Sequence, residues 1–141
     1  KMMNDYQLQK YGEINEIVCR LIFDFNVVSL SKVIITAFAI NNSKSHFETS
    51  RKEFGLIENI FKSFSLGFQT NSHDLRIVLE CVRLLENQKF ILVKNNVIIV
   101  NTKKETPKIN KILDSQIFKK TLGEIEKYSD KSFLKGVIDN V

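Results

Sequence analysis

Few residues of this chain have the type and spacing that catalysis or ligand binding requires. The only histidines are His46 and His73, and a zinc site would need four ligands that include a close pair of Cys or His residues. Cys19 and Cys81 lie in apolar helical patterns, which is typical of buried thiols in a reducing cytoplasm, although a disulfide between them stays open. No phosphate-binding loop or dinucleotide fingerprint is formed by the five glycines, which are Gly12, Gly55, Gly67, Gly123 and Gly136. No Ser, Cys or Thr comes with a base in a recognisable motif, so we expect no enzyme activity, no catalytic residue, no metal site and no cofactor.

Charge is the more informative property. Eight lysines lie between residues 89 and 120 and are opposed there only by Glu105 and Asp114, so this stretch accounts for the whole excess of positive charge, which is +5 over the chain. Lysines on such a segment can contact DNA phosphates, and the alternative is a solvated face that touches nothing. The candidate nucleic-acid contacts are Lys94, Lys103, Lys104, Lys108 and Lys111.

A helix over residues 72–88 would precede most of these lysines. Its apolar side chains recur at helical spacing and cover most of the circumference, which predicts a buried helix. The remaining polar stripe is expected to pair with itself, as Arg76 with Glu80 and Glu80 with Arg83. A helix that reads base edges needs several free polar side chains, so any DNA contact should be to the backbone and independent of sequence.

A β-hairpin is predicted over residues 90–101. Two β-rich runs flank Asn95-Asn96, and Asn tolerates the positive φ angles of a type I′ turn. This turn would set Val93 against Ile98 and Ile91 against Val100. Glycine in place of Asn96 should then be tolerated, because glycine also suits a positive φ.

The rest of the chain reads as helices. Asn4 or Asp5 can cap a first helix with an apolar face and a polar side that includes Glu13, Glu16, Arg20 and Asp24. Ser29 or Ser31 can cap a second, whose β-branched residues also permit a strand. Ser50 and Glu53 form a capping box for a third, which Gly67 would end. Its aromatic residues are expected in the core: Phe61, Phe64 and Phe68.

C-terminal helices are predicted from residue 107 onward. Thr106 can cap and Pro107 can occupy the first helical position, and Thr121 with Glu124 forms a second capping box. The final segment is apolar, and such a segment docks on the core or on a partner. The candidate partner contacts are therefore Phe133, Leu134, Val137 and Ile138.

These patterns together predict one α+β domain over residues 1–141 that is mostly helical. A helix that leads directly into a hairpin, after earlier helices, is the order of a winged-helix-like domain, and a generic α+β packing is the alternative. We expect neither a membrane span nor a signal peptide, and a cytoplasmic location.

The chain resembles the small middle-component subunits of bacterial ABC-three-component systems, which include the small subunit of Lamassu-type antiphage defence. The likeness lies in the size, in the apolar pair Leu21-Ile22-Phe23 and Val33-Ile34-Ile35-Thr36-Ala37-Phe38, and in the helix and wing of residues 75–100 followed by a helix. It implies a non-enzymatic adaptor between an SMC- or Rad50-like ATPase and an effector such as a nuclease. The family has no catalytic motif, so no functional residue carries over. The alternative function is a free-standing winged-helix DNA-binding protein, for instance a transcriptional regulator.

Overall fold

The computed structural model describes residues 3–42 and 56–141. Within these ranges the chain is mostly helical with one antiparallel hairpin, so the predicted α+β class is confirmed. His46 and the capping box of Ser50 and Glu53 lie outside the described residues. The elements, in order, are α1 (Asp5–Cys19), a π-helical turn (Arg20–Asp24), α2 (Leu30–Asn41), α4 (Leu56–Thr70), α5 (His73–Asn87), β1 (Ile91–Lys94), β2 (Val97–Val100), a 3-10 turn (Ile112–Asp114), α6 (Gln116–Lys127) and α7 (Asp130–Asn140).

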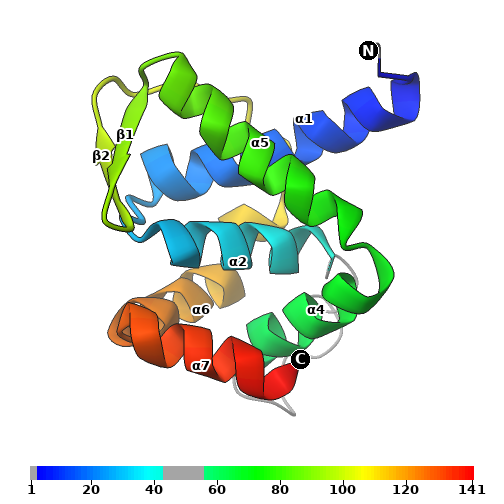
Figure 1. The fold of residues 1–141 in the computed structure, drawn as a ribbon, viewed down its shortest axis with the longest axis vertical. Helices are drawn as coiled ribbons and strands as arrows, with labels where there is room; N and C mark the ends of the chain where they lie inside the picture. The colour runs from blue at the N-terminus through cyan, green and yellow to red at the C-terminus, as the bar shows by residue number, and fades with distance from the viewer. Residues whose placement is uncertain (1–2, 43–55) are drawn as a thin grey trace.

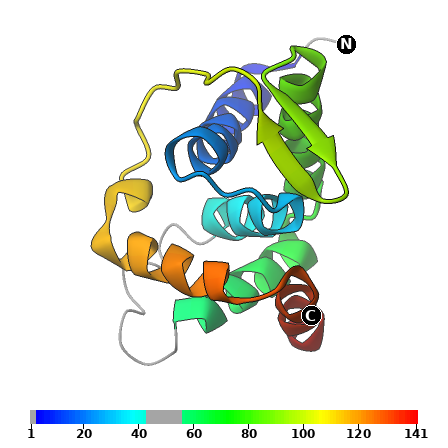
Figure 2. The same cartoon turned by 90° about the vertical axis from the view of Figure 1, so that its left-hand side faces the viewer.

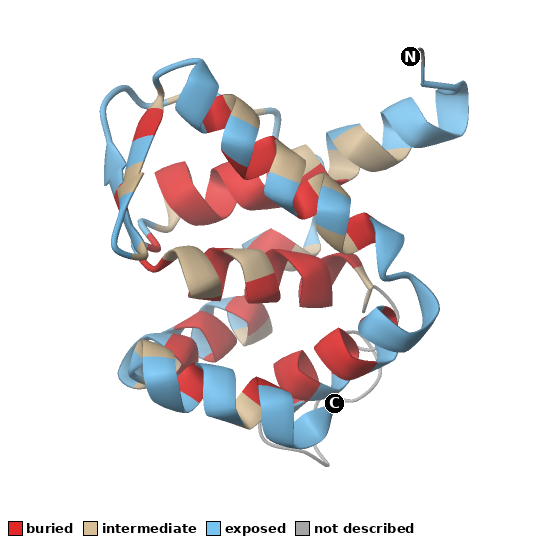
Figure 3. Ribbon diagram, in the orientation of Figure 1, coloured by how far each residue is buried: buried red, intermediate tan, exposed pale blue. Residues whose placement is uncertain are grey.

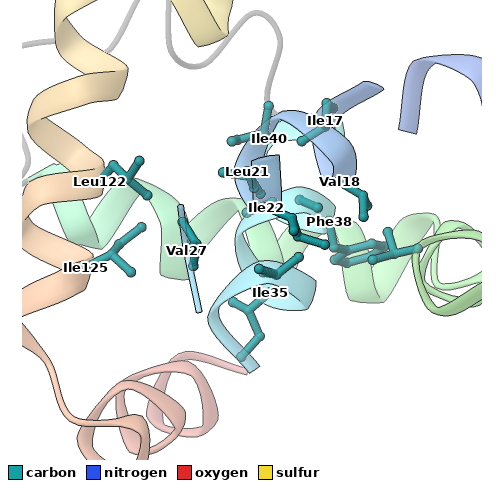
Figure 4. Close-up of a cluster of buried hydrophobic side chains, with 14 of the residues drawn as sticks. Ile17, Val18, Leu21, Ile22, Val27, Ile35, Phe38, Ile40, Leu122 and Ile125 are labelled. Carbon is teal, nitrogen blue, oxygen red and sulfur yellow. The ribbon is translucent and has the colours of Figure 1, made fainter. Parts of the chain in front are cut away.

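The central element is α2, which lies between an upper group of α1, α5 and the hairpin and a lower group of α4, α6 and α7 (Figure 1). It packs against α1, α4, α5 and α7. Ser29 caps it by accepting a hydrogen bond from the backbone N–H of Lys32, which confirms the helical prediction over the strand. Side chains of α1, the π-helical turn, α2 and α6 belong to one buried apolar cluster, in which Figure 4 labels Ile17, Leu21, Phe38 and Leu122.

The hairpin has the predicted register. Ile91 pairs with Val100 and Val93 with Ile98, and both turn residues have positive φ, 52° at Asn95 and 65° at Asn96. The second strand also pairs outward with the connection before α2, because the Ile98 N–H donates to the Val28 carbonyl over 2.7 Å. This outer pairing fastens a hairpin that would be marginal on its own.

The side chain of Asn96 does more than fit the turn. Its Oδ1 accepts hydrogen bonds from the backbone N–H and the hydroxyl of Ser31, and its Nδ2 donates to Asp130 at the start of α7. Asp130 also accepts a hydrogen bond from Ser29, and these two partners hold the pKa of its carboxyl below the ordinary value. One turn residue therefore joins the hairpin to the beginnings of α2 and α7.

Several predicted helix boundaries are wrong. No helix begins at Pro107: residues 101–111 are not helical, and α6 begins at Gln116 with Ser115 as its cap. Thr121 is buried in the middle of α6 and donates to the Ile117 carbonyl, so it caps nothing. Gly67 lies inside α4, three residues before its end.

The expectation that α5 is buried on nearly all sides is also wrong. The helix lies at the surface, and Figure 3 shows exposed residues alternating with buried ones along it. Val78, Cys81 and Leu85 face the core, whereas Leu79 is exposed. The apolar stripe of α5 is thus wider than the surface that α1 and α2 cover.

We predict that glycine destabilises the protein at one turn position and is neutral at the other. Asn96→Gly should lower the free energy of unfolding by about 1–2 kcal/mol, because it removes the hydrogen bonds to Ser31 and Asp130. Asn95→Gly is the control, because Asn95 has the same kind of φ but an exposed side chain. It should change stability by less than about 0.5 kcal/mol in urea unfolding. This reverses the sequence-based expectation for Asn96, and equal unfolding midpoints for the two variants would contradict it.

Candidate functional site

An apolar groove with a volume of about 480 Å³ is formed by four helices. Its lining residues come from α2, α4, α5 and α7, whose ribbons are labelled in Figure 1. One polar side chain, that of Ser31, and nine apolar side chains line it: Ile34 and Ile35 of α2, Phe64 and Phe68 of α4, Leu75 of α5, and Leu134, Val137, Ile138 and Val141 at the C-terminal end. A concave apolar surface of this size is within the range of ligand and partner sites.

The inner face of α7 fixes one wall of the groove. The rings of Phe61 and Phe133 lie 5.6 Å apart, and Tyr128 packs edge-on against both. Gly136 permits this close approach, since a Cβ there would lie 2.5 Å from Cζ of Phe61. Packing on this face turns the opposite face of α7 toward solvent.

The four predicted partner contacts of α7 differ in exposure. Phe133 and Val137 are buried, and Val137 lines the bottom of the groove, whereas Leu134 and Ile138 line the groove while 38% and 70% exposed. Sequence analysis missed Phe68, which was expected in the core but is 45% exposed at the groove. The helical spacing of α4 alone does not show that its last turn extends past the helices covering it.

The lysine-rich stretch is organised around an extended segment, residues 101–111, which we call the strap. The strap is held by two buried side chains of the first helix and its π-helical turn. Glu16 accepts hydrogen bonds from the backbone N–H groups of Ile109 and Asn110, over 2.9 and 2.7 Å. Arg20, only 3% exposed, donates to Glu16, to the Asn110 carbonyl and to Asp114. These two residues belong to the side of the helix that was predicted to be polar, and the strap covers them.

The five predicted DNA contacts are not equivalent. Lys108 forms an ion pair with Asp24 over 2.9 Å, and the Lys104 ammonium lies 5.3 Å from the centroid of the Phe90 ring. Lys94, Lys103 and Lys111 are exposed, and no ion pair among the described residues involves them. Only part of the set is therefore available to phosphates without breaking an internal contact.

Of the two ion pairs predicted along the polar stripe of α5, the structure contains one. Arg83 donates to Glu80 through both Nε and a terminal nitrogen. The pairing lowers the pKa of the Glu80 carboxyl. No hydrogen bond between Arg76 and Glu80 is present among the described residues.

The buried thiols lie near the phenol of Tyr11. Cys19 and Cys81 are both free and buried. Burial raises the pKa of the Cys81 thiol to about 12, and it also raises the pKa of the neighbouring Tyr11 phenol to about 12. A thiol in this state is a poor nucleophile at neutral pH. Over residues 3–42 and 56–141, no cluster of three His, Cys, Asp or Glu residues is placed to hold a metal ion.

Comparisons with protein-family models, with curated proteins and with solved structures found no match to this chain. In the part of the chain that the structure describes, none of the helices combines the length and hydropathy needed to cross a membrane. The site is therefore interpreted from its own geometry, which offers one apolar groove and one lysine-bearing strap.

We predict that Glu16→Gln loosens the strap without unfolding the domain. Gln retains one carbonyl acceptor but loses the charge that pairs with Arg20, so the two strap N–H groups lose part of their binding. Hydrogen exchange at Ile109 and Asn110 should become at least roughly tenfold faster.

The control for this experiment is Glu80→Gln, which removes a carboxylate whose one ion pair among the described residues is with Arg83 on the surface of α5. Its effect on exchange in the strap should be negligible. Unchanged exchange at Ile109 in the Glu16 variant would show that Glu16 does not hold the strap.

Proposed function

We propose that this chain is a non-catalytic adaptor subunit that binds a partner protein through the groove between α2, α4, α5 and α7. The main support for this proposal is the groove, in which the apolar side chains of Phe68, Leu134 and Ile138 are exposed. A folded domain gains nothing from exposing such side chains together unless another surface covers them.

The proposed complex follows from the resemblance to middle-component subunits of bacterial defence systems. In it, the chain links an SMC- or Rad50-like ATPase to an effector such as a nuclease, in the bacterial cytoplasm. Its task is antiphage defence or DNA surveillance, and it needs no cofactor of its own.

A winged-helix arrangement of α5 and the hairpin belongs to the same proposal. In that arrangement the second wing strand pairs with a short segment that precedes the second helix. The bridge between Ser29 and Val97 and the hydrogen bond from Leu30 N–H to the Asn96 carbonyl support this order. In this interpretation α4 is an addition between the second helix and α5.

DNA contact is the second element of the proposal, and it is limited to the phosphate backbone. Lys94 on the hairpin and Lys103 on the strap are exposed side chains without an ion pair in the described parts of the chain. The pairing of Glu80 with Arg83 works against base reading by α5. Two or three such lysines give weak contact that depends strongly on salt.

The first test is purification of the tagged protein from its native host. We expect an ATPase and an effector to co-purify in fixed ratio with the wild-type chain. The double variant Leu134→Gln/Ile138→Gln should lose them, because it replaces two exposed groove side chains with polar ones. The hairpin pair Leu92→Gln/Ile99→Gln is the matched control, since these side chains are 48% and 46% exposed and lie outside the groove.

Two outcomes would contradict the proposal. If the groove variant keeps its partners and the hairpin variant loses them, the groove is not the binding surface. If the wild-type chain purifies without protein partners and binds one DNA sequence tightly at high salt, it is a free-standing regulator.

The second test concerns the lysines. In the assembled complex, Lys94→Glu/Lys103→Glu should weaken binding to duplex DNA equally for all sequences. It should also reduce the slope of log affinity against log salt by about two, one for each lost phosphate contact. Lys120→Glu/Lys127→Glu on α6 makes the same charge change away from the strap and should leave the slope unchanged.

Lys108 is left out of the lysine variant because its reversal would break the ion pair with Asp24 and confuse the result. An unchanged slope for the Lys94 and Lys103 variant would show that this surface is only solvated.

A further inference from the structure

The lining of the groove determines which kind of polypeptide can occupy it. Apart from Val141, every lining residue lies in a helix, whose backbone N–H and C=O groups are largely paired within the helix itself. An extended peptide would find no strand edge here, and its own backbone polar groups would be buried without partners. A helix satisfies its backbone internally and can offer apolar side chains at positions i, i+3, i+4 and i+7.

The charged residues that neighbour the lining residues along α5 and α7 indicate the electrostatic character of that helix. Each carboxylate of α5 and α7 next to a lining residue is already engaged. Asp74 binds Lys10 and Asn41, and Asp139 binds Lys135.

The third carboxylate, Asp130, lies one turn before Leu134 and binds Ser29 and Asn96. Two cations on the same helices, unlike these acids, have no partner among the described residues. Arg76 follows Leu75 on α5, and Lys131 lies three residues before Leu134 on α7. Both are exposed, and no hydrogen bond or ion pair within the described residues involves them.

We propose that the groove binds an amphipathic α-helix of another protein, and that this helix carries carboxylates beside its apolar face, near Arg76 and Lys131. This inference rests on the proposed adaptor function and names the chemistry of its partner. The apolar anchors supply affinity, and the two cations select acidic helices over basic ones.

The experiment is a display selection with a library of amphipathic helices against the full chain. The library keeps an apolar stripe and randomises the positions beside it. Counter-selection uses Leu134→Gln/Ile138→Gln, so that only groove-dependent helices survive. We expect the enriched helices to carry Asp or Glu beside the stripe, and peptides made from them should bind in fluorescence anisotropy.

Two variants then separate the apolar and the charged contributions in the same assay. Leu134→Gln/Ile138→Gln should weaken peptide binding roughly tenfold or more, while Leu92→Gln/Ile99→Gln leaves it unchanged. Arg76→Glu/Lys131→Glu should weaken an acidic helix roughly tenfold and strengthen a basic one. Circular dichroism melts check that each variant is folded, which the exposure of all six side chains favours.

Three results would overturn the inference. The first is that no helix enriches over the groove variant, and the second is that the enriched helices carry neutral or basic flanks. The third is that the wild-type chain forms a dimer in light scattering that Leu134→Gln/Ile138→Gln abolishes, which would make a second copy the occupant. The adaptor function is judged separately. If the native complex forms and depends on Leu134 and Ile138 but not on Arg76 and Lys131, the adaptor stands and only the acidic-helix inference fails.

Discussion

The buried guanidinium of Arg20 is the constraint on which the second half of the chain depends. A charged group removed from water is costly unless it is paired and hydrogen-bonded, and Arg20 meets this condition through Glu16, Asp114 and the Asn110 carbonyl. Two of these partners come from residues 110–114, so burial of Arg20 requires the strap to cross the first helix. The crossing fixes where the 3-10 turn and α6 begin, and so places α6 and α7 against α4.

A second set of polar contacts fixes the positions of the hairpin and α7 relative to α2. Asn96, Ser29 and Asp130 come from three segments that are distant in sequence, and their hydrogen bonds meet at the first turn of α2. The lowered pKa of Asp130 means that this junction stabilises the fold at neutral pH and loses that contribution as acid protonates the carboxyl. Apolar packing alone would allow the helices to slide, whereas these directional contacts specify one arrangement.

The success of sequence reasoning depended on how local each signal was. The hairpin register and turn followed from Asn95 and Asn96 between two β-rich runs, and Ser29 was one of two serines that the sequence offered as the cap of α2. The false helix start at Pro107 shows the limit of such signals, because Thr106 and Pro107 suit a helix locally while Glu16 takes the backbone N–H groups just beyond them. The exposure of Phe68 and Leu134 could not be inferred either, since helical spacing shows that a face is apolar but not which neighbour covers it.

The positions of the two candidate surfaces suit an adaptor. Figure 2 shows the strap, drawn in yellow, on one side of the molecule and α7 on the other, with α1 and α2 between them. A helix seated between α2, α4, α5 and α7 would therefore leave Lys103 of the strap free to meet phosphates at the same time. Charge reinforces this division. The strap region carries the excess of lysines, whereas the groove lining is apolar apart from Ser31. Salt weakens interactions between exposed charges far more than apolar contacts. In the proposed complex, DNA would therefore dissociate as salt rises while the protein partner stays bound.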